Sequence, residues 1–281
     1  MEICSGYTGM ESLGDAFLIH TDAPDLKLVF LTDEIIRLRV SFDRAFAEES
    51  YTLALTAWKD RLDFLFPHDR LHIAAVHPIV EETDASIAFT TASLRLVLAK
   101  DPFCIRLFDK EGSEVYSSLA GSSFTLDANR RITHYSRMEE DDCFYGFGEK
   151  GGNLNKNGET IVQRATDSFA YDPLKTDTLY KHIPFYLQLR RKTGKAVGLF
   201  YHNFYESVFN LGREKSNYWP HYTTWRADGG DIDLFLLGGN SIKTILDHYT
   251  LLTGRPALLP KRALGYQGSS MYYAELEKDS D

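Results

Sequence analysis

The chain has 281 residues, of which 43% are hydrophobic and 25% are charged, a composition typical of a folded globular protein with one large or two small domains. The 31 basic residues against 40 acidic ones leave a net charge of −9, so the surface as a whole would repel nucleic acid phosphates and anionic lipids. We therefore expect no nucleic acid partner and no membrane partner.

The cysteines and the first residues bear on the cellular compartment. Cys4, Cys104 and Cys143 are odd in number and lie far apart, unlike the dense cysteines of a disulfide-stapled secreted domain. Residues 1–18 contain acidic but no basic residues, which is unlike a secretory signal. No apolar run approaches the roughly 20 residues that span a bilayer. These features predict a cytoplasmic protein.

Most of the chain up to residue 237 has the pattern of short strands. Runs rich in β-branched and aromatic residues alternate with polar positions, as in antiparallel sheets with one wet face. The clearest predicted strands span 26–31, 35–40, 85–90, 93–99, 103–108, 184–189 and 232–237. Turns that end in glycine, at 109–112 and 191–194, indicate hairpins. The pattern predicts a mainly β sandwich or barrel, with residues 52–66 fitting either a loop or a short helix.

One later segment has a helical pattern instead. Asn240 is the predicted N-cap, and apolar residues follow at spacings of three and four from Ile242 to Leu252 until Gly254 ends the pattern. We therefore predict an amphipathic helix over 241–253 that closes the β domain. An apolar, strand-like pattern resumes over 257–273 and is interpreted as the opening of a further domain.

Two motifs suggest cofactor or metal sites but lack the context for them. Residues 146–151 match G-x-G-x-x-G, yet helix-breaking residues follow at 152–158, where a dinucleotide site needs a helix. We assign Gly146 and Gly148 to a close backbone approach instead. His68 and His72 are four residues apart but lack the glutamate of a zinc-binding H-E-x-x-H helix. The sequence predicts no cofactor and no metal site.

Several motifs, in order along the chain, resemble glycoside hydrolase family 31, the family of α-glucosidases and α-xylosidases. They are Phe144–Glu149, Thr166-Asp167, Leu179–Tyr186, Gly198–Asn203, Tyr249–Pro256 and Ala263–Ser269. The resemblance implies a large antiparallel two-sheet supersandwich, similar to galactose mutarotase, over residues 1–239. It further implies a helix and linker over 240–260 and the first strand of a truncated (β/α)8 catalytic barrel over 261–281. Residues 269–273 depart from the usual family pattern, so no sugar preference is carried over.

The same resemblance implies a non-catalytic role for this chain. Only 21 residues follow Pro260, whereas a (β/α)8 barrel takes about 250. The paired carboxylates of a retaining glycosidase therefore fall outside the chain, and no residue in it is expected to be catalytic. The parent protein is expected to hydrolyse α-glucosidic or related bonds, with this domain supporting the barrel and lending the loop 151–181 to the substrate pocket.

The substrate-binding residues are also inferred from the resemblance. Asp167, preceded by Thr166, occupies the place of a short acidic residue that binds a sugar hydroxyl in the family, and a carboxylate suits that task because it offers only acceptors. The alternative for Asp167 is a loop-capping Asx-turn. Met271 and Tyr272, at the start of the barrel, are the other candidates. The implied partner is an α-linked oligosaccharide or glycoside, and the unpaired strand 263–273 is expected to be buried in a homo-oligomer.

Two other functions stay open on the sequence. A stand-alone carbohydrate-binding sandwich would use an exposed aromatic residue, such as Trp219 or Trp225, as a sugar platform, but would not need the segment 257–273. A mutarotase-type epimerase would need its own acid and base, a His and a Glu, facing each other in the sandwich cleft. The sequence does not place such a pair.

Overall fold

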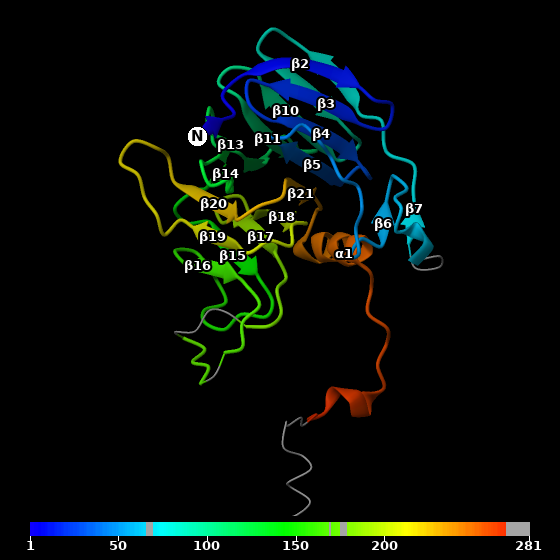
Figure 1. Cartoon of the computed structure of the whole chain (residues 1–281), viewed down its shortest axis with the longest axis vertical. Coiled ribbons are helices and arrows are strands. Elements are labelled where there is room, and N and C mark those ends of the chain that lie inside the picture. Colours follow the sequence, from blue (N-terminus) through cyan, green and yellow to red (C-terminus); the bar gives the residue numbers. More distant parts are fainter. Residues whose placement is uncertain (66–69, 169, 175–178, 268–281) are drawn as a thin grey trace, which may run out of the picture.

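The computed structural model describes residues 1–65, 70–168, 170–174 and 179–267. It is mainly antiparallel β, as the alternating pattern predicts, with the β layers at one end and a tail leaving from the C-terminal helix (Figure 1). The seven clearest predicted strands agree with observed strands to within one residue at each end. Both predicted turns join neighbouring antiparallel strands, β11 with β12 and β17 with β18.

The largest sheet has eight strands, in the order β15-β17-β18-β21-β5-β4-β3-β2. In that order they are β15 (Cys143–Gly146), β17 (Phe185–Arg190), β18 (Lys195–Tyr201), β21 (Ile232–Leu237), β5 (Ile35–Ser41), β4 (Asp25–Phe30), β3 (Phe17–Thr21) and β2 (Tyr7–Ser12). All neighbouring pairs are antiparallel. Strands far apart in sequence, such as β5 and β21, therefore meet at the centre of one sheet.

Two further sheets form the opposing layer of the sandwich. The six-stranded sheet contains β1 (Glu2–Ile3), β13 (Phe124–Leu126), β14 (Ile132–Arg137), β20 (Tyr222–Ala227), β19 (Ser207–Leu211) and β16 (Thr160–Gln163), in that order. The five-stranded sheet contains β12 (Glu114–Ser117), β11 (Cys104–Asp109), β10 (Leu94–Ala99), β9 (Ser86–Thr90) and β8 (Ile79–Glu82). A bridge between Ser118 and Ser136 links them. The predicted second sheet is thus split into two.

The central strands of the eight-stranded sheet, β5 and β21, are buried on both faces, so successive side chains enter two different cores. On β21, Leu234 and Leu236 point into the main core that the other two sheets complete. Phe235 and Leu237 point to the opposite side, into a second core. That side is covered by α1 (Ile242–Thr253) and by the segment that carries β6 (Leu55–Thr56), η1 (Asp63–Leu65) and β7 (Leu71–His72).

The helix α1 occupies the predicted range, but its cap differs from the prediction by one residue. Ser241, not Asn240, is the N-cap, and its hydroxyl oxygen accepts a hydrogen bond from the Thr244 backbone N–H at 3.1 Å. Asn240 instead accepts a hydrogen bond from the Thr244 hydroxyl at 2.8 Å. Only part of the predicted apolar stripe is buried: Ile245 is inaccessible, whereas Leu246 is 42% exposed.

The strand predicted over 263–273 is not formed in residues 263–267, whereas its burial in a homo-oligomer stays a prediction. The chain from 257 to 267 is exposed, and Lys261–Leu264 forms a single 3₁₀ turn, η2. An extended strand needs a neighbour for its backbone groups, and none of the described strands pairs with this segment. Local bonds such as Ala263 N–H to Pro260 C=O at 2.9 Å take their place. Residues 268–273 lie outside the described residues.

Cys4, Cys104 and Cys143 are all buried free thiols. In the described ranges, no helix has the length and apolar character that a membrane span requires.

Candidate functional site

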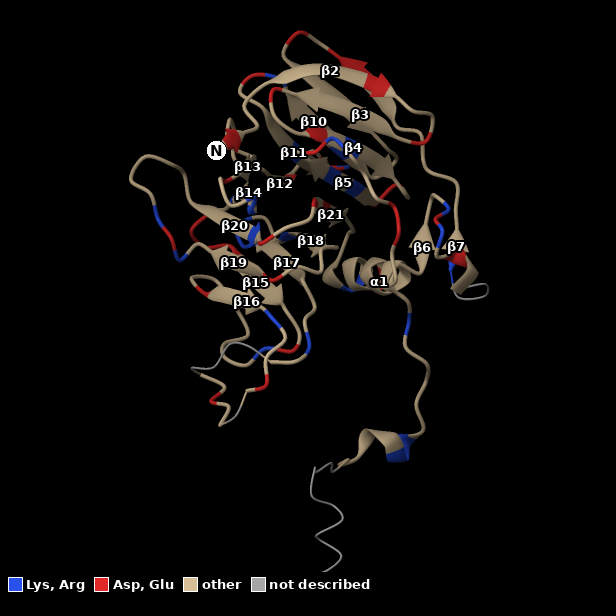
Figure 2. Ribbon diagram, in the orientation of Figure 1, with Lys and Arg blue, Asp and Glu red and all other residues tan. Residues whose placement is uncertain are grey.

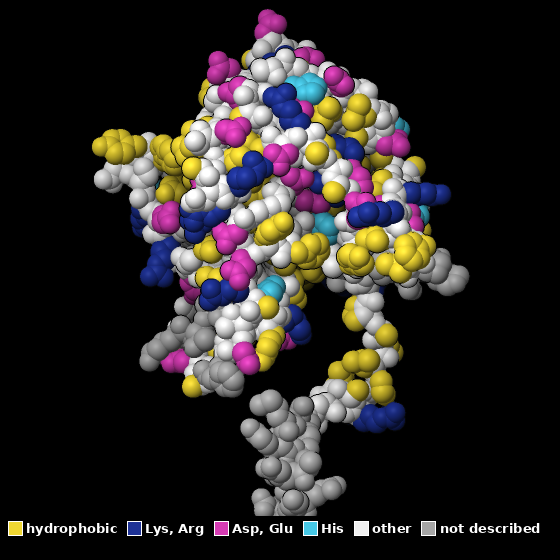
Figure 3. Space-filling model, viewed as in Figure 1, with side chains coloured by type: hydrophobic (Ala, Val, Ile, Leu, Met, Phe, Trp, Pro, Cys, Tyr) yellow, Lys and Arg dark blue, Asp and Glu magenta, His cyan; other side chains and the backbone are white. Residues whose placement is uncertain are grey.

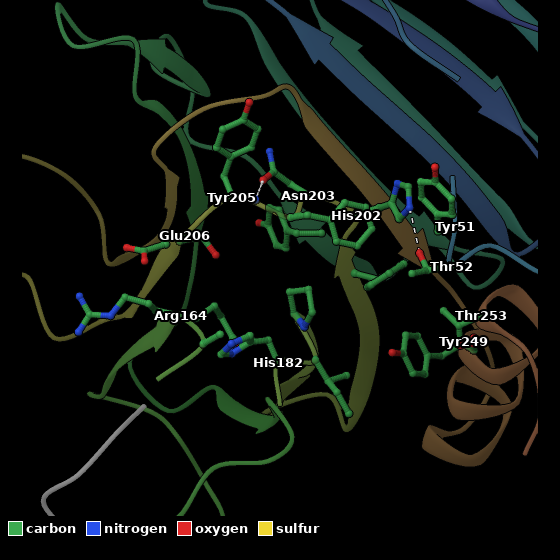
Figure 4. A pocket seen from close by; sticks show the side chains of 18 residues that line it. Tyr51, Thr52, Arg164, His182, His202, Asn203, Tyr205, Glu206, Tyr249 and Thr253 are labelled. Atoms are coloured by element: carbon green, nitrogen blue, oxygen red, sulfur yellow. Dashed lines mark hydrogen bonds between the residues drawn. The ribbon is translucent and has the colours of Figure 1, made fainter. Parts of the chain in front are cut away.

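A cavity of about 600 Å³ opens where five separate parts of the chain meet. They are residues 51–52, the end of β16, the residues just before β17, the β18–β19 connection and the C-terminal part of α1 (Figure 4). Its wall is mixed: Tyr51, Phe204 and Tyr249 supply aromatic surface, while Arg164 and Glu206 supply charge. Pockets of this size and mixture are typical of binding sites.

His202 in the cavity wall is fixed by a buried hydrogen-bond chain. Its Nδ1 lies 2.9 Å from Asp233 Oδ2, and its Nε2 lies 2.8 Å from Ser50 Oγ and 3.1 Å from Thr52 Oγ1. The order Ser, His, Asp resembles a hydrolytic triad. However, Ser50 is 1% exposed and its hydroxyl oxygen accepts the backbone N–H groups of Thr52 and Leu53 at 3.2 and 3.1 Å. Ser50 therefore stabilises a turn, and the hydrogen bonds from Asp233 through His202 to Ser50 and Thr52 hold the cavity wall in place.

Asp233 also ties that wall to the centre of the large sheet. Arg37 on β5 donates to both Asp233 oxygens at 2.8 Å and to Glu48 at 2.8 Å, and its guanidinium lies 4.0 Å from the centre of the Trp58 ring. Basic positions on β5 lie beside acidic positions of neighbouring segments (Figure 2). Burial by itself would raise the pKa of Asp233, but the charge and hydrogen bonds of Arg37, with those of His202, hold it well below the usual range.

Two residues of the cavity wall have buried polar groups without partners. Gln163, the last residue of β16, is 4% exposed, and neither its side-chain oxygen nor its nitrogen has a hydrogen-bond partner in the described part of the chain. The same holds for both ring nitrogens of His182, which lies before β17 (Figure 4). Burial, with the charge of Lys150 second, lowers the pKa of His182 and favours its neutral form. Unpaired buried groups of this kind are costly.

The loop predicted over 151–181 is only partly a loop, because β16 adds to the edge of the six-stranded sheet. Its base is closed by an ion pair between Lys181 Nζ and Glu149 Oε1 at 2.7 Å, both side chains being exposed. The segment thus begins on a rigid strand at Gln163, where it enters the cavity wall.

Thr166 and Asp167 follow two and three residues after Arg164 in the cavity wall, beside the cavity and not in its lining. Asp167 is exposed and accepts a hydrogen bond from the Tyr180 hydroxyl, which raises the pKa of Tyr180. The Thr166 backbone N–H lies 3.4 Å from the Leu179 carbonyl oxygen. Met271 and Tyr272 lie outside the described residues. Asp167 and Thr166 stay predictions as substrate-binding residues.

The glycine motif and the two tryptophans named in the sequence analysis differ in their surroundings. Gly146 has φ +137°, and a Cβ there would lie 2.5 Å from the Phe185 carbonyl oxygen, so close backbone approach requires glycine. A loop, and no helix, follows this motif. Trp225 is buried, which excludes it as a platform, whereas Trp219 is 44% exposed. In the described ranges, no group of three or more His, Cys, Asp or Glu side chains is placed to hold a metal ion.

The buried histidine inside the sandwich does not fit the base of an epimerase. His134 is fully buried, and its two ring nitrogens lie 2.7 Å from the Tyr116 hydroxyl and 2.9 Å from the Tyr201 hydroxyl. Burial lowers its pKa to about 3. An epimerase would need a titrating His that faces an acidic partner and substrate; His134 instead satisfies two core tyrosines.

The cavity can bind but lacks the groups for retaining hydrolysis. That reaction needs two carboxyl groups about 5 to 5.5 Å apart, whereas Glu206 is the single carboxylate among the described lining residues. Exposed aromatic side chains of Tyr51 and Phe204 line the cavity, and further exposed apolar side chains lie on the elements that cover the second core: Leu246 on α1, Phe64 on η1 and Leu71 on β7. Hydrophobic side chains gather at this end of the molecule and along the tail (Figure 3). We call the cavity and these five residues the open face.

Comparison with known proteins matches a family model to most of the chain. The model described as the glycosyl hydrolase 31 N-terminal galactose mutarotase-like domain matches residues 25–210. Alpha-glucosidase 2 of Bacillus thermoamyloliquefaciens is 34% identical over 266 residues, which is 94% of this chain and 30% of that protein. An alpha-glucosidase of Saccharolobus solfataricus is 29% identical over 177 residues, 63% of this chain and 24% of that protein.

Solved structures give the same picture. The GH31 dextranase of Flavobacterium johnsoniae, complexed with glucose, is 26% identical with a TM-score of 0.80 over 95% of this chain and 30% of that chain. A mutant of the same dextranase was solved with isomaltotriose, with a TM-score of 0.79. The present chain therefore spans less than a third of the length of these relatives.

Proposed function

The chain belongs to the glycosyl hydrolase 31 N-terminal galactose mutarotase-like domain family, and from this premise we propose that it is the non-catalytic N-terminal domain of an α-glycosidase. Its open face supports a (β/α)8 catalytic domain, and the loop after β16 completes the substrate pocket. The parent enzyme hydrolyses α-glucosidic or related bonds with retention. Residues 1–239 form the sandwich, 240–260 the helix and linker, and 261–281 the start of the barrel.

The observation that carries this proposal is the incomplete wall of the open face. Gln163 and His182 bury polar groups that lack partners in the described residues, and each such group costs about 1–3 kcal/mol. Phe204 at 70% and Leu246 at 42% exposure are apolar neighbours of the same opening. A second protein surface would supply hydrogen-bonding partners for these polar groups and would cover the exposed apolar side chains. The tail leaves α1 beside this opening, since Thr253 lines the cavity.

For the substrate we propose an α-linked oligosaccharide or glycoside, in keeping with the glucose and isomaltotriose bound by the dextranase. Asp167 and Thr166 contact it from the loop after β16, with Met271 and Tyr272 contributing from the barrel side. We place the enzyme in the cytoplasm on the sequence evidence. Without the catalytic domain, the open face and the segment 263–273 lead this chain to self-associate.

Activity measurements on two proteins test the proposal. The 281-residue chain alone is expected to show no hydrolysis of 4-nitrophenyl α-glucoside or isomaltose. The same sequence extended into the complete protein is expected to hydrolyse at least one α-glycoside with retention, followed by NMR of the first anomer released. Turnover by the purified 281-residue chain, or a complete protein that releases only the inverted anomer, contradicts the proposal.

A further inference from the structure

A second aromatic surface lies at the far end of β19 from the cavity. Ser207 begins β19 and lines the cavity, whereas Leu211 ends the strand and leads into the hairpin to β20. Five residues at about 3.3 Å each place roughly 15 Å between these ends. The hairpin tip projects from the body of the molecule and carries hydrophobic side chains (Figures 1 and 3).

The rings at this tip are exposed and held in position. Trp219 is 44% exposed, although its ring is packed edge-to-face against Tyr135 at 5.9 Å and Tyr222 at 5.8 Å. Tyr218 beside it is 95% exposed. The Ser216 hydroxyl oxygen accepts the backbone N–H groups of both residues at 3.1 and 3.2 Å. A ring that packs against two neighbours and is still 44% exposed can bind a flat partner with little further loss of conformational freedom.

Polar groups flank the rings. The backbone N–H of Glu214 is held by Asn210 Oδ1 at 3.1 Å, which fixes the start of the hairpin. Burial, and then the negative charge of Glu214, raises the pKa of both Tyr135 and Tyr222. Exposed aromatic rings on a hairpin that also carries a carboxylate suit a pyranose ring, which presents C–H groups on its face and hydroxyl donors on its edge.

We propose that Tyr218, Trp219 and Glu214 form an auxiliary α-glucan-binding surface, which we call the hairpin platform. The α-linked class rests on the proposed function above. A protein partner fits less well, because a stable interface buries about 800 Å² on each side, far more than two exposed rings on a tip otherwise rich in charged and polar residues provide. The platform would hold a polysaccharide chain at a point remote from the cavity.

Native gel electrophoresis of the 281-residue chain tests the platform. Gels contain dextran, soluble starch or, as a β-linked control, hydroxyethylcellulose. Retardation by at least one α-glucan is expected. Trp219→Ala is expected to raise the apparent Kd at least about fivefold, and Tyr218→Ala is expected to raise it less. Tyr266→Ala is the matched control, since that ring is 96% exposed on the tail; it is expected to bind like the wild type.

Several outcomes would overturn the platform: no retardation by either α-glucan, equal retardation of wild type and Trp219→Ala, retardation by hydroxyethylcellulose alone, or equal weakening by Tyr266→Ala. If circular dichroism shows that Trp219→Ala is misfolded, Tyr218→Ala decides, because its ring is almost wholly exposed. If the chain is not retarded but the complete protein hydrolyses α-glycosides, only the platform is refuted. If retardation depends on Trp219 but the complete protein does not hydrolyse α-glycosides, only the proposed function is refuted.

Discussion

The buried ion pair between Arg37 and Asp233 offers the sharpest test of how the cavity wall is held. Asp233 is 5% exposed, accepts two hydrogen bonds from Arg37 and contacts His202. Asp233→Ala would leave a 2%-exposed guanidinium with only Glu48 to balance its charge. Removing one partner of a buried pair costs about 3–5 kcal/mol, because the other charge stays buried.

We therefore expect Asp233→Ala to lower the free energy of unfolding by about 3–5 kcal/mol and Tm by about 6 to 15 °C. Asp43→Ala is the matched control: Asp43 pairs with Arg130 at 2.7 Å, but both side chains are about two-thirds exposed. Such a surface pair contributes about 0–1 kcal/mol. Urea unfolding at pH 7 measures both variants. A loss below about 1 kcal/mol for Asp233→Ala, or one no larger than for Asp43→Ala, would refute the reasoning.

The same pair predicts a pH dependence with a definite sign. The folded chain holds the pKa of Asp233 well below its value in the unfolded chain, about 3.9. As pH falls, the unfolded state therefore binds this proton first, so the contribution is full above about pH 5 and is lost progressively below it. The stability of the wild type is expected to fall more steeply than that of Asp233→Ala between about pH 5 and pH 3. Parallel curves contradict this.

Three further predictions concern Asp167 in the loop after β16, Gly146 at the end of β15 and Gln163 in the cavity wall. In the complete enzyme, Asp167→Ala is expected to lower kcat/KM by about 10- to 150-fold, the equivalent of a hydrogen bond to a charged group, with Tm unchanged; unaltered kinetics would return Asp167 to a structural role. Gly146→Ala is expected to lose more stability in urea unfolding than Gly112→Ala, because the added Cβ would lie 2.5 Å from a backbone oxygen at Gly146 and has nothing within 4 Å at Gly112; equal losses contradict this. Gln163→Leu is expected to leave the 281-residue chain as stable or more stable, since it removes a buried amide that has no partner among the described residues. The same change is expected to lower the Tm of the complete enzyme. A loss above about 1 kcal/mol in the unfolding free energy of the chain alone would mean that Gln163 has a partner within it.

Local pattern was enough to predict the mainly β fold and seven of its strands, but not how the strands divide among sheets. Alternation predicts a strand wherever one face is buried, so β5 and β21 were found within one residue of their bounds. It does not report which strands pair, because register partners such as Arg37 and Phe235 are almost 200 residues apart. The split of the second layer into two sheets was missed for that reason.

The candidate site shows the same limit more strongly. The cavity joins residues from five separate segments, so no motif in the sequence marks it. Gln163 and His182 were missed as site residues because what distinguishes them is polar groups that are buried and lack a partner among the described residues, a property of the folded chain. The strand expected at 263–273 is absent from residues 263–267 because an apolar run alone does not supply the neighbouring strand that its backbone needs.

The central claim, that the open face is a docking surface for a catalytic domain, is tested most directly by hydrogen exchange. Amide exchange would be compared between the 281-residue chain and the complete protein, peptide by peptide. The account predicts slower exchange in the complete protein for peptides over 163–167 and 182–184 and for the exposed side of α1, with no change at the remote edge strands β2 and β8. Equal exchange at the open face in the two proteins, or protection confined to β2 and β8, would contradict it.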